Sequence, residues 1–127
     1  MKVFKKQNGD LRTTPKEALK FTPVKNTEIK ETRQETGEVL LNYSVKIRPW
    51  FVGLIRRLGK ETESLETKKL QLDELGTTVW DLINGTRSVK QIIQLFAEKY
   101  QLHIKEAEVS VTQFLRELGK RGLIGLK

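Results

Sequence analysis

Residues 68–124 constrain the fold more than any other part of the chain, because a strand pattern is followed there by three helical patterns with clear boundaries. Residues 68–72 alternate between polar and apolar side chains, as a strand with one buried face does. Asp73 is placed to cap a first helix, and Asn84 with Gly85 is placed to end it. This order predicts one strand followed by three helices.

Each predicted helix carries an apolar stripe at helical spacing, which indicates a shared core. Ser88 and Gln91 form the capping box that opens the second helix, and the third helix covers residues 105–121. In chain order, the stripes contain Leu75, Val79, Trp80, Leu82 and Ile83; Val89, Ile92, Ile93, Phe96 and Tyr100; and Ala107, Val111, Phe114, Leu115 and Leu118.

A β-hairpin is predicted ahead of this stretch, with arms at residues 28–33 and 38–45. Gly37 lies in the turn, where it can adopt the positive φ that short hairpin loops require. The hairpin and the strand at 68–72 predict a three-stranded antiparallel sheet. The fold class is therefore α+β, with a hairpin plus one strand packed on three helices in a winged-helix-like arrangement.

Residues 1–27 are predicted to be a basic, flexible N-terminal extension, and residues 28–127 the folded domain. The extension has seven Lys or Arg against two acidic residues, two prolines and no sustained periodicity. A basic tail can contact nucleic acid. This one lacks the interleaved aromatic residues that stack on bases, which favours a solvated extension.

The residue types exclude most catalytic chemistry. The chain has no cysteine, which rules out disulfides and thiolate metal sites and suits a reducing compartment. His103 is the only histidine, so no second imidazole can complete a metal shell. Phosphate-binding loops and nucleophile motifs are also missing. We therefore expect a cytoplasmic protein that is not an enzyme and uses no metal or cofactor.

No window of the sequence reaches the ~18 consecutive apolar residues of a membrane span, so no transmembrane segment is expected. Residues 50–60 combine an apolar helical face with Arg56, Arg57 and Lys60. Such a helix can close over a sheet face, dock a partner enzyme or make peripheral contact with an anionic membrane. The sequence favours the first and leaves the other two open.

A strand followed by three helices is also compatible with a winged helix-turn-helix that binds nucleic acid. Residues 89–100 and 105–121 would then be the positioning and recognition helices. The exposed face of the second carries Glu106 and Glu117, which a polyanion repels, and few base-reading side chains. Nucleic-acid binding is therefore the alternative function and not the favoured one.

Several short motifs in this region together resemble the PqqD-like family. The motifs are residues 72–76 (LDELG), 79–83 (VWDLI), 84–89 (NGTRSV) with Ile92, and the ending at 114–118 and 121–124. The resemblance implies a three-stranded sheet with three helices and a role as a peptide-recognition element. Family members capture the leader of a ribosomally made precursor peptide and present it to a modifying enzyme, often a radical-SAM enzyme. The basic front end and an insertion at 47–67 depart from the compact family pattern.

The peptide site is predicted at the open edge of the sheet, because an extended peptide can add a strand there. A peptide would lie antiparallel to residues 69–72, with its side chains against one flank of the last helix. The predicted site residues are Lys69, Leu70, Gln71 and Leu72 on the strand and Glu108, Thr112, Leu115 and Arg116 on the helix. Specificity is expected from this helix flank and from the cationic Lys69 and Arg116.

Overall fold

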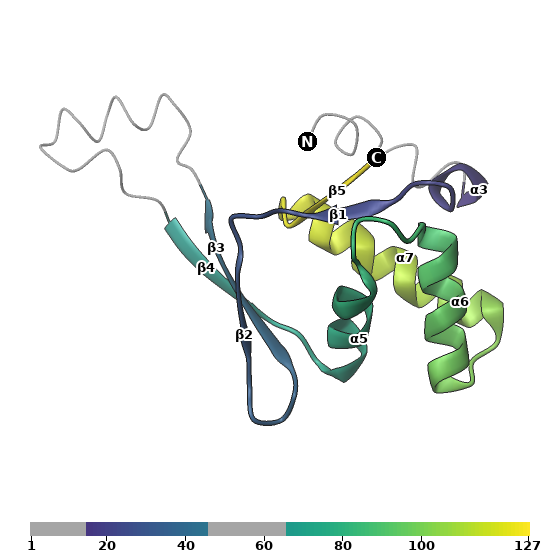
Figure 1. Cartoon of the computed structure of the whole chain (residues 1–127), viewed down its shortest axis with the longest axis horizontal. Helices are drawn as coiled ribbons and strands as arrows, with labels where there is room; N and C mark the ends of the chain where they lie inside the picture. The colour runs from purple at the N-terminus through teal and green to yellow at the C-terminus, as the bar shows by residue number, and fades with distance from the viewer. Residues whose placement is uncertain (1–14, 46–65) are drawn as a thin grey trace, which may run out of the picture. The chain divides into compact units, whose positions relative to one another are not determined.

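The computed structural model describes residues 15–45 and 66–127 (Figure 1). The described residues form two compact units. We call residues 28–45 and 66–72 the sheet unit, and residues 15–27 with 73–127 the helical unit. The predicted helix at 50–60 lies outside the described residues.

The sheet unit contains three antiparallel strands in the order β2-β3-β4, which confirms the predicted sheet. The strands are β2 (Lys30–Arg33), β3 (Val39–Val45) and β4 (Glu66–Gln71). Gly37 has a φ of +91° in the turn between β2 and β3, as expected for this hairpin loop. β4 begins at Glu66, two residues before the predicted start, since the polar pair Glu66 and Thr67 gave no alternation to follow.

One face of the central strand is buried. Val39, Leu41 and Tyr43 are 1%, 0% and 7% exposed, and the side chains between them, Leu40 and Asn42, are half-buried. This alternation is the period-two pattern that the sequence showed. The register is fixed by the same pattern, because a slip of one residue would expose all three buried side chains.

The helical unit contains the three predicted helices, α5 (Glu74–Leu82), α6 (Val89–Tyr100) and α7 (Ile104–Lys120), which contact one another. Asp73 caps α5 as predicted, and its Oδ1 accepts a hydrogen bond from the amide of Gly76 at 2.8 Å. The capping box at the start of α6 is also present.

A second capping box, which the sequence analysis did not identify, opens α7. The Nδ1 atom of His103 accepts from the amide of Lys105 at 3.1 Å, and the carboxylate of Glu106 accepts from the amide of His103 at 3.3 Å. These two hydrogen bonds give His103, whose side chain is exposed, the role of a helix cap.

Two short strands that the sequence did not predict close the helical unit. β1 (Pro23–Lys25) pairs antiparallel with β5 (Ile124–Leu126), and α3 (Pro15–Ala18) precedes β1. Three-residue strands are too short to display a period, and their pairing is non-local. Residues 15–25 thus contribute regular structure to a segment for which only a flexible extension was expected.

Pro23 lies at a position of the β1–β5 ladder that does not need a backbone amide proton. Thr22 and Lys127 exchange both backbone hydrogen bonds, at 2.9 and 3.0 Å. The next pair, Pro23 with Leu126, is therefore of the non-hydrogen-bonded type, where a missing amide proton costs no ladder bond. Pro23 is fully buried, so it contributes packing without leaving an unsatisfied donor.

The core of the helical unit consists of side chains from all three helices and β5. Those at most 3% exposed include Val79, Trp80, Ile92, Ile93, Phe96, Ala107, Val111, Leu118, Leu123 and Ile124. In the described part of the chain, no helix has both the length and the apolar content that crossing a membrane would require.

Candidate functional site

β4 is an edge strand of the described sheet, and its hydrogen-bonding pattern shows which groups point away from β3. The amide of Leu72 donates to the carbonyl of Val39 at 2.9 Å, so Leu72 faces β3. Orientation alternates along an antiparallel strand. The backbone groups of Lys69 and Gln71 therefore point outward, and those of Leu70 point inward.

The side chains of the predicted strand residues divide into two kinds. Lys69 and Gln71 are exposed, whereas Leu70 is half-buried and Leu72 is 2% exposed. The Gln71 side-chain amide donates to the carbonyl of Leu72 at 2.9 Å, which holds it at the end of the strand. The edge consequently offers main-chain groups between exposed polar side chains.

The predicted residues on the last helix lie in α7 and belong to the helical unit, whereas those on the strand belong to the sheet unit. Glu108, Thr112 and Arg116 are half-buried, and Thr112 donates its hydroxyl to the carbonyl of Glu108 at 2.7 Å. Leu115 is only 5% exposed. Leu115 thus occupies the core stripe in which the sequence analysis also placed it.

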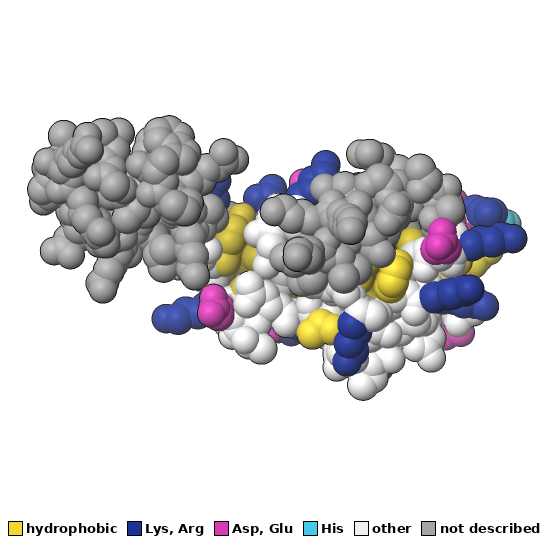
Figure 2. All heavy atoms as spheres, turned by 90° about the horizontal axis from the view of Figure 1, so that it is seen from above, with side chains coloured by type: hydrophobic (Ala, Val, Ile, Leu, Met, Phe, Trp, Pro, Cys, Tyr) yellow, Lys and Arg dark blue, Asp and Glu magenta, His cyan; other side chains and the backbone are white. Residues whose placement is uncertain are grey.

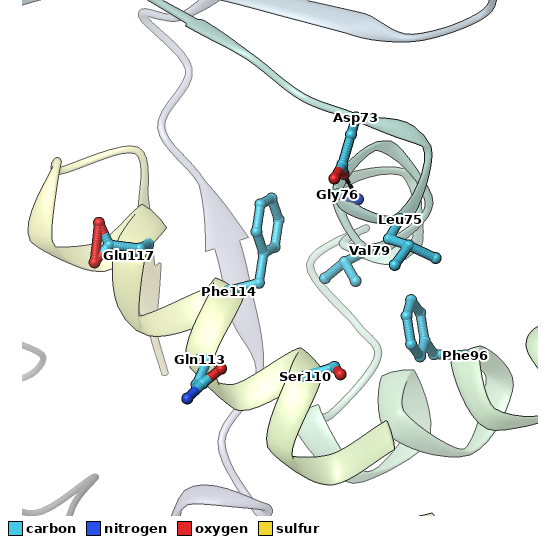
Figure 3. A pocket seen from close by; sticks show the side chains of 9 residues that line it. All are labelled: Asp73, Leu75, Gly76, Val79, Phe96, Ser110, Gln113, Phe114 and Glu117. Atoms are coloured by element: carbon cyan, nitrogen blue, oxygen red, sulfur yellow. Dashed lines mark hydrogen bonds between the residues drawn. The ribbon is translucent and has the colours of Figure 1, made fainter. Parts of the chain in front are cut away.

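A groove that the sequence analysis did not propose as a site lies between the start of α5 and the side of α7 (Figure 3). We call it the α5–α7 groove. Its volume is about 320 Å³. Its lining residues are Asp73, Leu75, Gly76, Val79, Phe96, Ser110, Gln113, Phe114 and Glu117.

The floor of the groove is apolar and partly open to solvent. Leu75 is 47% exposed although the sequence placed it in a core stripe. Phe114, from the third stripe, is half-buried and points from α7 toward the first turn of α5 (Figure 3). Spacing identified both residues as apolar-face residues, but it could not show that the space between them is unfilled.

The groove and the predicted flank lie on nearly opposite sides of α7. Successive residues of an α-helix are rotated by about 100° around its axis. Ser110, Gln113 and Glu117 therefore lie roughly half a turn away from Glu108 and Thr112. A ligand on one side of α7 would leave the other side free.

A second hollow follows β1 and β5. It is lined by Val24, Lys25, Asn26, Thr27, Gly122, Ile124, Gly125, Leu126 and Lys127. Its charged lining side chains are both lysines, in contrast to the carboxylates of the α5–α7 groove.

Among the described residues, no group of three His, Cys, Asp or Glu side chains could hold a metal ion.

Comparison with known protein families gives a match over the strand and the three helices. Residues 63–124 match the family model described as coenzyme PQQ synthesis protein D (PqqD). Just under half of the chain is thus similar to PqqD. The match starts just before β4 and ends at the first residue of β5, so the PqqD-like region includes the β4 edge and every residue that lines the α5–α7 groove.

A solved structure shares the fold of this chain. It is the solution NMR structure of the PqqD truncation of Methylobacterium extorquens PqqCD, with a TM-score of 0.53 and 16% sequence identity. The alignment covers 81% of this chain and 87% of that chain. That protein is described as a functional, stand-alone recognition element for ribosomally synthesized and post-translationally modified peptides. Comparison with curated proteins gives no match.

Proposed function

We propose that the PqqD-like domain is a non-catalytic peptide-binding module. It captures the leader of a ribosomally made precursor peptide and presents it to a modifying enzyme in the cytoplasm. The structural observation that carries this proposal is the outward-facing edge of β4. The function described for the structurally similar PqqD truncation supports it.

Capture by β4 would use main-chain hydrogen bonds. Thr67, Lys69 and Gln71 present outward donors and acceptors at every second residue, as an added antiparallel strand requires. Each such bond contributes ~0.5–1.5 kcal/mol net. Because these bonds do not depend on the ligand's side chains, β4 would supply affinity more than specificity.

Self-association through the same edge is opposed by its side chains. Lys68 and Lys69 are exposed neighbours on β4, and edge lysines disfavour pairing between two copies of a sheet. Their charge also favours acidic residues in the part of a ligand that pairs with the strand. The edge is thereby suited to a different chain more than to a second copy of itself.

The helical unit has two candidate surfaces of its own for ligand side chains. The flank with Glu108, Thr112 and Arg116 was predicted from the sequence, with Leu115 among its residues. The α5–α7 groove is the better candidate, since it is open and exposes an apolar floor. Leu115, being buried, would support that flank from within the core instead of contacting a ligand.

The partner enzyme follows from the same proposal. A domain that binds a leader without modifying it requires a second protein for the chemistry, and the PqqD-like resemblance favours a radical-SAM enzyme. Residues 50–60 are a candidate dock for that enzyme or for a membrane surface. Co-purification with a radical-SAM enzyme encoded in a neighbouring gene would test this part of the proposal.

Calorimetry with candidate leader peptides from neighbouring short genes tests the capture step. Gln71→Pro removes an outward amide of β4 and should weaken binding severalfold. Glu31→Pro is the matched control, because Gln34 donates to Glu38 at 2.9 Å and Glu31 must therefore face outward on the opposite edge, β2. Equal binding by the two variants would show that the peptide does not pair with β4.

Nucleic-acid binding, the alternative from the sequence, receives no support from the family match or the similar structure. The chain has a formal net charge of +8, and Figure 2 shows more Lys and Arg than Asp and Glu side chains on the face it presents. Such a charge gives weak, sequence-independent attraction to any polyanion. A steep dependence of duplex DNA binding on salt, combined with no peptide binding, would reverse the ranking.

A further inference from the structure

We propose that the α5–α7 groove selects a ligand segment in which a bulky apolar side chain stands next to a lysine or arginine. This inference rests on the proposed peptide-binding function and specifies the class of sequence that the groove accepts. The groove would provide specificity, and the β4 edge would provide sequence-independent affinity.

The apolar half of the inference follows from the floor of the groove. Leu75 is nearly half exposed, and Val79 and Phe96, each at most 2% exposed, lie beneath it as rigid core side chains. Phe114 forms the opposite wall (Figure 3). An apolar side chain placed here removes its own surface and that of Leu75 from water, which favours binding roughly in proportion to the area buried.

Gly76 allows the Phe114 ring to pack directly against α5. A β-carbon built on Gly76 would lie 3.0 Å from Cε1 of Phe114 and 3.2 Å from Oδ1 of Asp73. A side chain at this position would push the Phe114 ring or occupy the space beside it. The absence of a side chain at Gly76 therefore lets the Phe114 ring lie close to α5, where it lines the groove.

The cationic half follows from the charges that line the groove. Asp73 and Glu117 are both acidic and exposed, and none of the described lining residues is Lys or Arg. Oδ1 of Asp73 accepts from Gly76, which leaves the second carboxylate oxygen able to accept from a ligand. A ligand ammonium or guanidinium would thus meet a carboxylate beside the apolar floor.

Glu117 has an intramolecular partner that a ligand can replace. Its carboxylate lies 3.9 Å from the ammonium of Lys120, and the two side chains are 56% and 59% exposed. Exposed pairs at this distance contribute little to stability. A cationic ligand residue can therefore compete for Glu117 at small cost.

The groove is locally opposite in sign to the chain as a whole, which carries a net charge of +8. The net positive charge disfavours the approach of a cationic segment, whereas the two carboxylates of the groove attract it. An acidic segment experiences the reverse. Discrimination between two ligands depends on such repulsion as well as on attraction.

Two dipeptide probes test the inference directly by NMR: acetyl-leucyl-arginine amide and acetyl-leucyl-glutamate amide. We expect the first to shift the backbone amide signals of Gly76 and Phe114, with about twofold to fivefold tighter binding than the second, because exposed charge pairs have effects of this order. The preference should shrink as salt is added.

The variant that tests the charges combines Asp73→Asn with Glu117→Gln. Asparagine is as good an N-cap as aspartate, so α5 should keep its cap. The double variant should bind both probes equally. Glu98→Gln, which removes a carboxylate exposed on α6 outside the groove, should keep the preference.

Equal binding of the two probes to the unmodified protein would overturn the inference. So would shifts confined to the hollow along β1 and β5, or no shift at Gly76 and Phe114 with either probe. Failure here is distinguishable from failure of the proposed function, which is measured at β4 with Gln71→Pro. A leader peptide that needs β4 but ignores Asp73 and Glu117 would leave the function standing and remove only the specificity.

Discussion

The ammonium group of Lys25 lies 4.5 Å from the ring centroid of Trp80, so a side chain of β1 is held against the central side chain of α5. Trp80 is 1% exposed and Lys25 is half-buried. A cation over an aromatic face is more strongly attracted when water is partly excluded. This contact joins the front of the chain to the helical core independently of the ladder between β1 and β5.

Replacing Lys25 with methionine tests the strength of this contact. Methionine keeps most of the apolar stem and removes the charge, so the free energy of unfolding should fall by ~0.5–1 kcal/mol. Urea denaturation followed by circular dichroism measures it. Lys20→Met removes an exposed lysine as a control and should change stability by less than ~0.5 kcal/mol. Equal changes in the free energy of unfolding for the two variants would show that the contact between Lys25 and Trp80 does not contribute to stability.

Gly76→Ala should narrow the α5–α7 groove without unfolding α5. Alanine favours a helix over glycine by ~1 kcal/mol, and the contact with the Phe114 ring opposes this gain. We expect a small change in the melting temperature and a severalfold loss of affinity for the leucyl-arginine probe. The double variant Gly76→Ala with Phe114→Leu should recover affinity. No loss in the single variant would mean that ligand binding does not depend on the position of the Phe114 ring.

Ser88→Ala should lower stability by ~1 kcal/mol, since it removes the side chain that accepts from the amide of Gln91 at 3.1 Å. Ser110→Ala makes the same chemical change inside α7, where alanine is the better helix former. The melting temperature of the Ser88→Ala variant should therefore be lower than that of the Ser110→Ala variant. A similar loss in both would indicate that the capping box is not what stabilises the start of α6.

Two tryptophan substitutions distinguish the two sides of α7. Ser110→Trp should fill the α5–α7 groove and weaken leader binding at least tenfold, while Thr112→Trp, on the nearly opposite side, should leave it almost unchanged. Calorimetry with the same leader peptide measures both. The reverse result would place the peptide on the flank that the sequence predicted and remove the groove from the site.

Local signals in the sequence predicted most of the regular structure. Asp73 and the pair Ser88 with Gln91 identified helix starts, because a capping residue acts on amides within three positions. Gly37 identified the hairpin turn for a similarly local reason. These features depend on neighbouring residues only, so a single sequence contains the information to find them.

Two features that depend on distant residues were missed. The pairing of β1 with β5 joins two three-residue strands, neither of which has a recognisable period. The groove is lined by Leu75 and Phe114, among others, and these two residues are 39 positions apart in the chain. Helical spacing showed that Leu75 and Phe114 are apolar-face residues but carried no information about what fills the volume beside them.

The pairing of β1 with β5 also governs when the helical unit can be completed. Lys25 and Ile124 are partners in the ladder although about 100 residues separate them. During synthesis the chain must therefore emerge almost to residue 127 before β1 has anything to pair with. Contacts of this separation form late and slowly. Until then Pro23 and Val24 are without their strand partner, and a nascent chain interrupted before Leu123 presents them to solvent and to other chains.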